Sequence, residues 1–236
     1  MVGKSSKTFQ PLFFFIINQR RLWRTKFRIM KDRLNKIDLL LMQAGKVKPG
    51  HTLSGKNVFF TSDTHFGNSS ILSIRNRPFD DIEEMNKALI ENWNRVVGKN
   101  DLVFHLGDFA FGGAAVWNWF LDQLNGRIVL VVGNHDKHHL RPEVLGRFEL
   151  VSSEVFVIID NQPIFLNHHP FMSNGESHGK AWQLFGHVHT RGNGQDNDKA
   201  PLLLDTQYDV GVDYNNYTPI SFARVKEIIN AQQNNN

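Results

Sequence analysis

Five short polar segments of this chain carry side chains that could bind metal ions and transfer protons. Most of them follow an apolar run, and together they offer imidazole, carboxylate and amide groups but no thiolate. The segments are Asp63-Thr64-His65, Gly107-Asp108, Gly133-Asn134-His135-Asp136, His168 and Gly186-His187-Val188-His189. Nitrogen and oxygen donors of this kind suit two divalent ions held side by side, the usual device for attack of hydroxide on a phosphate ester.

The first two segments supply carboxylates after predicted strands. Residues two apart on an extended chain point the same way, so Asp63 and His65 can reach one ion together. Gly107 lets the backbone turn closely beneath a site, and the carboxylate of Asp108 can bridge two ions. Either segment alone is also an ordinary loop or turn, so the prediction depends on their occurring with the others.

The third segment places three polar side chains in a row after the run Val131-Val132. Asn134 can donate its amide oxygen to a metal. His135 can protonate a leaving alkoxide or stabilise charge on the phosphoryl oxygens. Asp136 can orient that imidazole.

The last two segments supply imidazoles. Neighbours on an extended chain diverge, so only one of His168 and His169 is expected to bind a metal. We favour His168 and expect His169 to line the pocket, with His169 as the alternative ligand. His187 and His189, two residues apart, point to one side, and their neutral imidazoles should bind metal less well as the pH falls.

The elements that would position these segments alternate between strands and helices after residue 55. The pattern predicts strands over 56–62, 102–106, 127–132, 154–159, 163–167, 183–187 and 208–212, and helices over 80–97, 114–124, 137–145 and 221–230. Alternating units followed by a run of short strands predict a layered α/β protein with more than one sheet.

The N-terminal segment differs from the rest in charge. Residues 1–50 contain 12 Lys and Arg but only 2 Asp and Glu, whereas the remainder contains 15 basic and 21 acidic residues. Apolar residues at alternating steps of four and three predict a helix over 19–43 with one apolar face. That face could dock on the catalytic domain or form a homodimer, and the basic face could bind nucleic acid or anionic lipid.

The composition sets the broad class of protein. The 236 residues suit one domain with an appendage, and 41% apolar content with 19 Phe supports a buried aromatic core. Without Cys there can be no disulfide or thiolate metal site. The run Leu12 to Ile17 is far shorter than the roughly 20 residues of a membrane span and lacks a cleavage site after it. We therefore expect a cytoplasmic protein without a transmembrane segment.

The five segments, in this order, resemble the calcineurin-like metallophosphoesterase superfamily, with its pattern D-x-H, G-D, G-N-H-[DE], H and G-H-x-H. The resemblance spans roughly residues 56–222. Three further stretches resemble a small bacterial and phage branch whose members are mostly described as predicted phosphoesterases. They are Thr61 to Gly67, Asn76-Arg77-Pro78-Phe79, and Asp209 to Asp213.

The resemblance implies a fold and a set of roles. It implies two mixed β-sheets packed as a sandwich flanked by helices over residues 51–236, preceded by a basic, largely helical extension over 1–50. It implies two divalent ions (Mn, Mg, Fe, Co, Ni or Zn) and a metal-bridging hydroxide as nucleophile, with His135 assisting the leaving group. The implied ligands are Asp63, His65 and His189 for the first ion, Asn134, His168 and His187 for the second, and Asp108 as the bridge.

Three residues are candidates for substrate contacts. Arg77, in one of the branch stretches, could clamp a phosphate with its forked donors or could be a surface residue beside a proline turn. Asn68 stands where members of the branch often carry His. His169 would line the pocket, and Asp213 would either support a ligand or lie in a turn.

Three functions are compatible with this reading. Short gaps between the motifs leave little room for a cap domain, which favours a phosphomonoesterase acting on small substrates such as (deoxy)nucleoside monophosphates. The alternative is a phosphodiesterase acting on cyclic nucleotides or nucleic acid, aided by the basic extension. A non-catalytic metal-binding scaffold is the alternative of another class, which the complete set of ligand positions disfavours.

Overall fold

The computed structural model describes residues 53–170, 181–190 and 204–234. The chain divides into two units, Met1–Lys46 and Val47–Asn236, and every described residue belongs to the second. The predicted helix over 19–43 and the basic extension lie outside the described residues.

The first of two sheets has five strands in the order β4-β3-β2-β1-β9. Its strands are β1 (Val58–Thr61), β2 (Leu102–His105), β3 (Arg127–Val131), β4 (Leu150–Ser152) and β9 (Ile220–Ser221). The first four run parallel and β9 runs antiparallel to β1, so the sheet is mixed. Phe60 lies opposite Phe104 in the register, and their rings stack with centroids 5.6 Å apart.

The second sheet has four strands in the order β5-β6-β7-β8. They are β5 (Glu154–Ile159), β6 (Gln162–Asn167), β7 (Trp182–Phe185) and β8 (Gln207–Asp209). Strand β5 is antiparallel to β6 and the other pairs are parallel, so this sheet is mixed as well.

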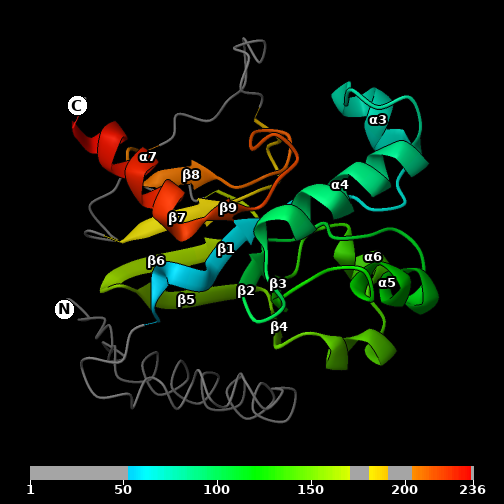
Figure 1. Cartoon of the computed structure of the whole chain (residues 1–236), viewed down its shortest axis with the longest axis horizontal. Coiled ribbons are helices and arrows are strands. Elements are labelled where there is room, and N and C mark those ends of the chain that lie inside the picture. Colours follow the sequence, from blue (N-terminus) through cyan, green and yellow to red (C-terminus); the bar gives the residue numbers. More distant parts are fainter. Residues whose placement is uncertain (1–52, 171–180, 191–203, 235–236) are drawn as a thin grey trace, which may run out of the picture. The chain divides into compact units, whose positions relative to one another are not determined.

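Helices flank the two sheets (Figure 1). They are α3 (Ser70–Arg75), α4 (Ile82–Val96), α5 (Ala114–Leu121), α6 (Asp136–His139) and α7 (Phe222–Asn234), with 3₁₀ turns η1 (Gly55–Asn57) and η2 (Pro142–Arg147). Helix α4 begins where the side chain of Asp81 accepts a hydrogen bond from the backbone N–H of Glu84. It buries Met85, Leu89 and Trp93, spaced four apart, in one core with residues of β2, β3 and α5.

The structure confirms the predicted fold class of two mixed sheets packed as a sandwich with flanking helices. Helix α7 packs near β1, β8 and β9. Its Phe222 ring lies 6.2 Å from that of Trp182 on β7. The predicted strands and the helices over 80–97, 114–124 and 221–230 are present; β5 has the predicted ends and the others have shifted ends.

One predicted helix is wrong. The segment 137–145 forms α6 and then η2 rather than one helix. Pro142 disfavours the helical conformation in the residue before it, and Arg141 is accordingly extended with φ −121° and ψ 150°. The short elements α3, β4 and β9 were not predicted.

The parallel strands of both sheets end at one place. The end of β1 meets the segment after β8 through a parallel bridge between Ser62 and Gly211. The backbone N–H of Gly186, after β7, donates to the carbonyl of His168, after β6. Loops at the carboxyl ends of strands are the usual place for a site in α/β proteins. Within the described residues, no helix has the length and apolar character needed to cross a membrane.

Candidate metal centre

Asp63, His65 and His189 lie together and form what we term the first ligand group. The Asp63 Oδ1 atom is 3.5 Å from His189 Nε2 and 3.9 Å from His65 Nε2. All three side chains are buried. Both Asp63 Oδ1 and His65 Nε2 are buried without a hydrogen-bond partner among the described residues, which is rare for polar atoms in a folded protein. A bound cation would satisfy both.

Asn134, His168 and His187 form the second ligand group. His168 Nε2 lies 2.9 Å from Asn134 Oδ1 and 3.4 Å from Asp108 Oδ2. The same Asp108 oxygen lies 3.7 Å from His65 Nε2. Asp108 therefore stands between the two groups, where a ligand shared by two ions would have to lie.

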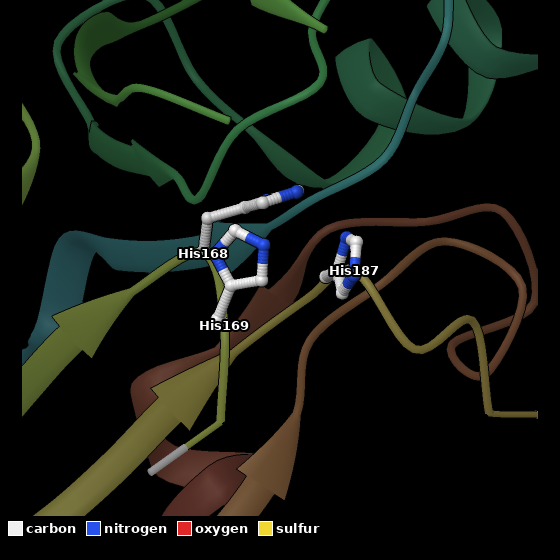
Figure 2. A group of neighbouring side chains, drawn as sticks. All are labelled: His168, His169 and His187. Atoms are coloured by element: carbon white, nitrogen blue, oxygen red, sulfur yellow. The ribbon is translucent and has the colours of Figure 1, made fainter. Parts of the chain in front are cut away.

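Figure 2 shows His168 and His169 after β6 facing His187 after β7. The His187 ring centroid lies 5.1 Å from that of His168 and 4.2 Å from that of His169, so both can approach it. His168 is buried and its Nδ1 lies 2.8 Å from the carbonyl oxygen of Leu106. His169 is exposed, and its ring makes no hydrogen bond to a described residue. The anchored ring is the better prepared ligand, which favours His168.

The backbone at the site is strained. Five of the seven proposed ligands have a positive φ, in a region that residues other than Gly, Asn and Asp rarely adopt. They are Asp63 (58°), His65 (50°), Asp108 (56°), His187 (69°) and His189 (51°). Such strain collects at functional sites and persists where surrounding contacts hold it.

Three glycines have no side chain at positions where a Cβ atom would overlap the side chain of a proposed ligand. A Cβ at Gly107 would lie 2.6 Å from His168 Nδ1. A Cβ at Gly133 would overlap the Asp108 carboxylate, and one at Gly186 would overlap Asp63. Glycine before a ligand is therefore a packing requirement here as well as a turn signal.

The groups at the site shift one another's ionisation. Burial raises the pKa of Asp63, but His189, His168 and His65 outweigh it, so the pKa lies below its ordinary value. The pKa of Asp108 is also lowered, because hydrogen bonding and charge from His168 exceed the effect of burial. Both carboxylates are ionised at neutral pH and ready to bind a cation.

The imidazoles divide into two kinds. Burial lowers the pKa of His65 to about 3, and burial together with nearby His168 and His169 lowers that of His187 to about 4. Burial would also lower the pKa of His168, but the carboxylates of Asp108 and Asp63 raise it to about 9. Without a metal, His168 is therefore the protonated partner of the carboxylates.

The structure gives Asp136 another role than the predicted orientation of His135. Its carboxylate accepts hydrogen bonds from the backbone N–H groups of Asp108, Phe109 and Gly133, at 2.8, 2.9 and 2.8 Å. Burial raises the pKa of Asp136 to about 6, although these hydrogen bonds by themselves would lower it. Asp136 thus ties together the loops after β2 and β3, and its described hydrogen bonds do not include the His135 ring.

His135 borders the site with an accessible ring. Its side chain is 45% exposed and its Nε2 lies 4.0 Å from Asp108 Oδ2. Its backbone N–H donates to Asp108 Oδ1 at 2.9 Å, so the carboxylate fixes the segment that carries the ring. The ring can therefore meet a substrate from the solvent side of the ligands.

Arg77 is neither at the surface nor free to clamp a phosphate, contrary to both readings of the sequence. Its side chain is buried, and the guanidinium pairs with Asp213 through two hydrogen bonds of 2.9 and 2.8 Å. The remaining donors reach the carbonyl oxygens of Asp63 and Thr64. The guanidinium of Arg77 is therefore bound by a carboxylate and two backbone carbonyl groups of the protein itself.

Two other polar residues lie beside the segments that carry the ligands. Asn68 Nδ2 lies 3.4 Å from His65 Nδ1, and its Oδ1 accepts from the N–H of Ser70. Asp209, which was given no role from the sequence, is buried and accepts from the N–H groups of Gly211 and Thr190. In the sequence it opens the branch stretch Asp209 to Asp213, within the predicted strand over 208–212 and two residues before Gly211.

The residues present fit two divalent ions. The donor set is three carboxylate or amide residues and four imidazoles, which suits borderline metals such as Mn, Fe, Co or Zn. Three overlapping triads can each hold an ion by distance: Asp63-His65-His189, Asp63-Asp108-His168 and His168-His169-His187. Shared members place the triads next to one another, as in a binuclear site.

The chain is similar in sequence to a known family and to several known proteins. The sequence profile of the family described as calcineurin-like phosphoesterase matches residues 56–214. An uncharacterized protein of Methanocaldococcus jannaschii is 33% identical over 183 residues, which cover 75% of this chain and 93% of the relative. The gene 66 protein of Mycobacterium phage L5 is 31% identical over 191 residues, which cover 66% and 86%.

A solved structure shares the fold. The crystal structure of a protein of unknown function from Aquifex aeolicus superimposes with a TM-score of 0.57 and 24% identity, covering 72% of this chain and 98% of that one. The profile match covers all the strands that carry the proposed ligands. The chain therefore belongs to the calcineurin-like phosphoesterase family and is a metal-dependent phosphoesterase.

Proposed function

We propose that the protein is a binuclear phosphomonoesterase acting on small substrates such as (deoxy)nucleoside monophosphates. The observation that carries the proposal is a pair of buried atoms without hydrogen-bond partners among the described residues, Asp63 Oδ1 and His65 Nε2. Beside them lies the Asp108 carboxylate, which is near both His65 and His168. When bound, two divalent ions lower the pKa of water and offset charge on the phosphoryl oxygens.

The chain's own residues supply the rest of the chemistry. Asp63 and Asp108 are ionised and bring negative charge that a cation must balance. Attack of hydroxide on phosphorus forms a new P–O bond and breaks the P–O bond to the leaving group. A leaving group that departs as an alkoxide needs a proton. His135 is exposed on the site and can donate that proton.

Polar and aromatic side chains border the proposed ligands. Beyond His135, polar side chains next to the ligands include the exposed His169 and the half-buried Asn68. Phe111 lies 5.1 Å from the His135 ring and 5.5 Å from the His65 ring, so an aromatic surface borders the proton donor. Such a surface could stack on the base of a nucleotide.

A hydrolysis screen tests the proposal. Mn, Mg, Ni, Co and Zn would be supplied in turn with p-nitrophenyl phosphate, bis-p-nitrophenyl phosphate and a panel of ribo- and deoxynucleotides. Asp108→Asn is a sharper control than Asp108→Ala, because Asn tolerates the positive φ and can still accept from His135 while lacking the charge. Phosphate released from monophosphates, and lost in the variant, supports the proposal; cleavage of diesters alone contradicts it.

The charge of residues 1–50 favours a second candidate, a phosphodiesterase acting on nucleic acid. The segment carries 12 basic and 2 acidic residues, which would attract a polyanion. KM for an oligonucleotide should then rise steeply with salt, since binding releases counterions. A KM that hardly depends on salt, with turnover confined to monophosphates, would reject this candidate.

A further inference from the structure

Arg77 connects two parts of the chain that are 136 residues apart. It follows α3 and its capping residue Asn76, which is in the left-handed conformation with φ 48°. Its partner Asp213 lies in the turns after β8. Nε and Nη2 of Arg77 donate to Oδ1 and Oδ2 of Asp213, a bidentate pair with both side chains buried.

Asp213 extends this pair to a proposed metal ligand. Its Oδ2 lies 2.7 Å from His189 Nδ1. An ionised carboxylate can only accept, so Nδ1 carries a hydrogen, and in the neutral ring Nε2 then keeps the lone pair. That Nε2 is the atom 3.5 Å from Asp63 Oδ1, so the pair selects the tautomer that can bind a metal there.

The same guanidinium holds the other members of the first ligand group. Nη2 donates to the carbonyl of Asp63 at 2.7 Å and Nη1 to that of Thr64 at 3.1 Å. These carbonyls lie within the segment where Asp63 and His65 have positive φ values. Charged donors on two successive carbonyls fix the orientation of that strained segment.

We infer that Arg77 and Asp213 are positioning residues for the first ligand group. Together they hold the His189 ring and the backbone of the Asp63–His65 segment, in a buried unit that also touches Met85 and Tyr217. Neither makes a described hydrogen bond or ion pair with Asn134, His168 or His187 of the second ligand group. Substitution of either residue should therefore lower the affinity for an ion at the first ligand group and leave the affinity at the second ligand group nearly unchanged.

This inference depends on the proposed binuclear function, and its test separates the two. Co²⁺ would be titrated into metal-free full-length protein, followed by its visible absorption, for wild type, Arg77→Lys and Asp213→Asn. His65→Gln and His187→Gln would assign the two binding events to the two groups. Arg147→Lys is the matched control, because Arg147 pairs with Asp122 at the exposed surface.

The expected result is selective. Both variants should bind Co²⁺ about 10–100-fold more weakly at the first ligand group, as outer partners of metal ligands usually do, with an altered spectrum for that ion. Affinity at the second ligand group and in Arg147→Lys should change by less than about threefold, as for a surface substitution. Circular dichroism and thermal melting of the metal-free proteins would verify folding.

Other outcomes overturn the inference. An equal loss of Co²⁺ affinity at both ligand groups, or no loss in variants that fold, would show that Arg77 and Asp213 do not position the first ligand group selectively. If neither variant folds, the pair serves global stability. Wild-type protein that binds fewer than two Co²⁺ ions would instead contradict the binuclear function itself.

Discussion

His168 is held by Leu106: its Nδ1 lies 2.8 Å from the Leu106 carbonyl oxygen. A carbonyl oxygen can only accept, so Nδ1 carries a hydrogen and Nε2 is turned toward Asn134 and Asp108. The ring is therefore oriented for a metal before any metal arrives. Its charge state in the metal-free protein then decides how binding depends on pH.

Metal binding at the second ligand group should release a proton from His168. With its pKa at about 9, His168 is protonated at pH 7.5, whereas His187 at about 4 is already neutral. Affinity should rise about tenfold per pH unit up to pH 9, since the metal competes with one proton. Calorimetry in buffers of different ionisation enthalpy measures the protons released. His168→Gln should release one fewer, and an equal count would contradict the charge state.

His135→Ala should separate substrates by their leaving groups. The ring is exposed and outside both ligand groups, so metal stoichiometry should not change. With a nucleoside monophosphate, kcat should fall about 10²–10⁴-fold, because the leaving alkoxide loses its proton donor. With p-nitrophenyl phosphate, whose leaving group is stable without a proton, the loss should be much smaller. Stopped assays on both substrates measure it, with the exposed His138→Ala as control. Equal losses would argue against proton donation.

Asp136→Asn should mainly reduce stability. Its carboxylate accepts from three backbone N–H groups, and an amide would replace one accepting oxygen with a donor. Leaving buried N–H groups unsatisfied should cost ~1–3 kcal/mol of unfolding free energy. Urea denaturation of the metal-free protein measures this. Unchanged stability with a large loss of kcat would instead restore the predicted role in orienting His135.

Gly133→Ala should disturb the proposed bridge. The added methyl would overlap the Asp108 carboxylate and lie 2.5 Å from the Asp108 backbone N. Since backbone must move, we expect destabilisation of ~1–3 kcal/mol and weaker binding of both ions. Gly146→Ala is the matched control, because no heavy atom lies within 4 Å of its added methyl and it should change stability by less than about 0.5 kcal/mol. Equal stability and metal affinity in the two variants would contradict the packing role of Gly133.

Local patterns predicted most of the fold. Apolar runs such as Leu102–His105 and Arg127–Val131 are strands at nearly the predicted positions, because buried strands leave a clear apolar signal. The segments that follow them come together because parallel strands of both sheets end in one place. The ligand roles themselves stay predictions until metal binding is measured.

Long-range pairing was beyond the sequence. The contact of Arg77 with Asp213 spans 136 residues, and no local pattern distinguishes a buried arginine from one beside a surface turn. The role of Asp136 depends on backbone N–H groups from two loops. The types of side chain in the sequence do not indicate which backbone N–H groups will lie near a carboxylate. The break at Pro142 could have been predicted, because proline restricts the residue before it.

The proposed ligands come from both sheets of the sandwich. Asp63, His65 and Asp108 follow strands of the five-stranded sheet, and His168, His187 and His189 follow strands of the four-stranded sheet. Ions bound by these residues would act as cross-links between the sheets and bind the folded chain alone. At 100 times its dissociation constant each would add ~2.7 kcal/mol to stability. A preparation stripped by a chelator would then melt early, and its low activity could be mistaken for poor folding.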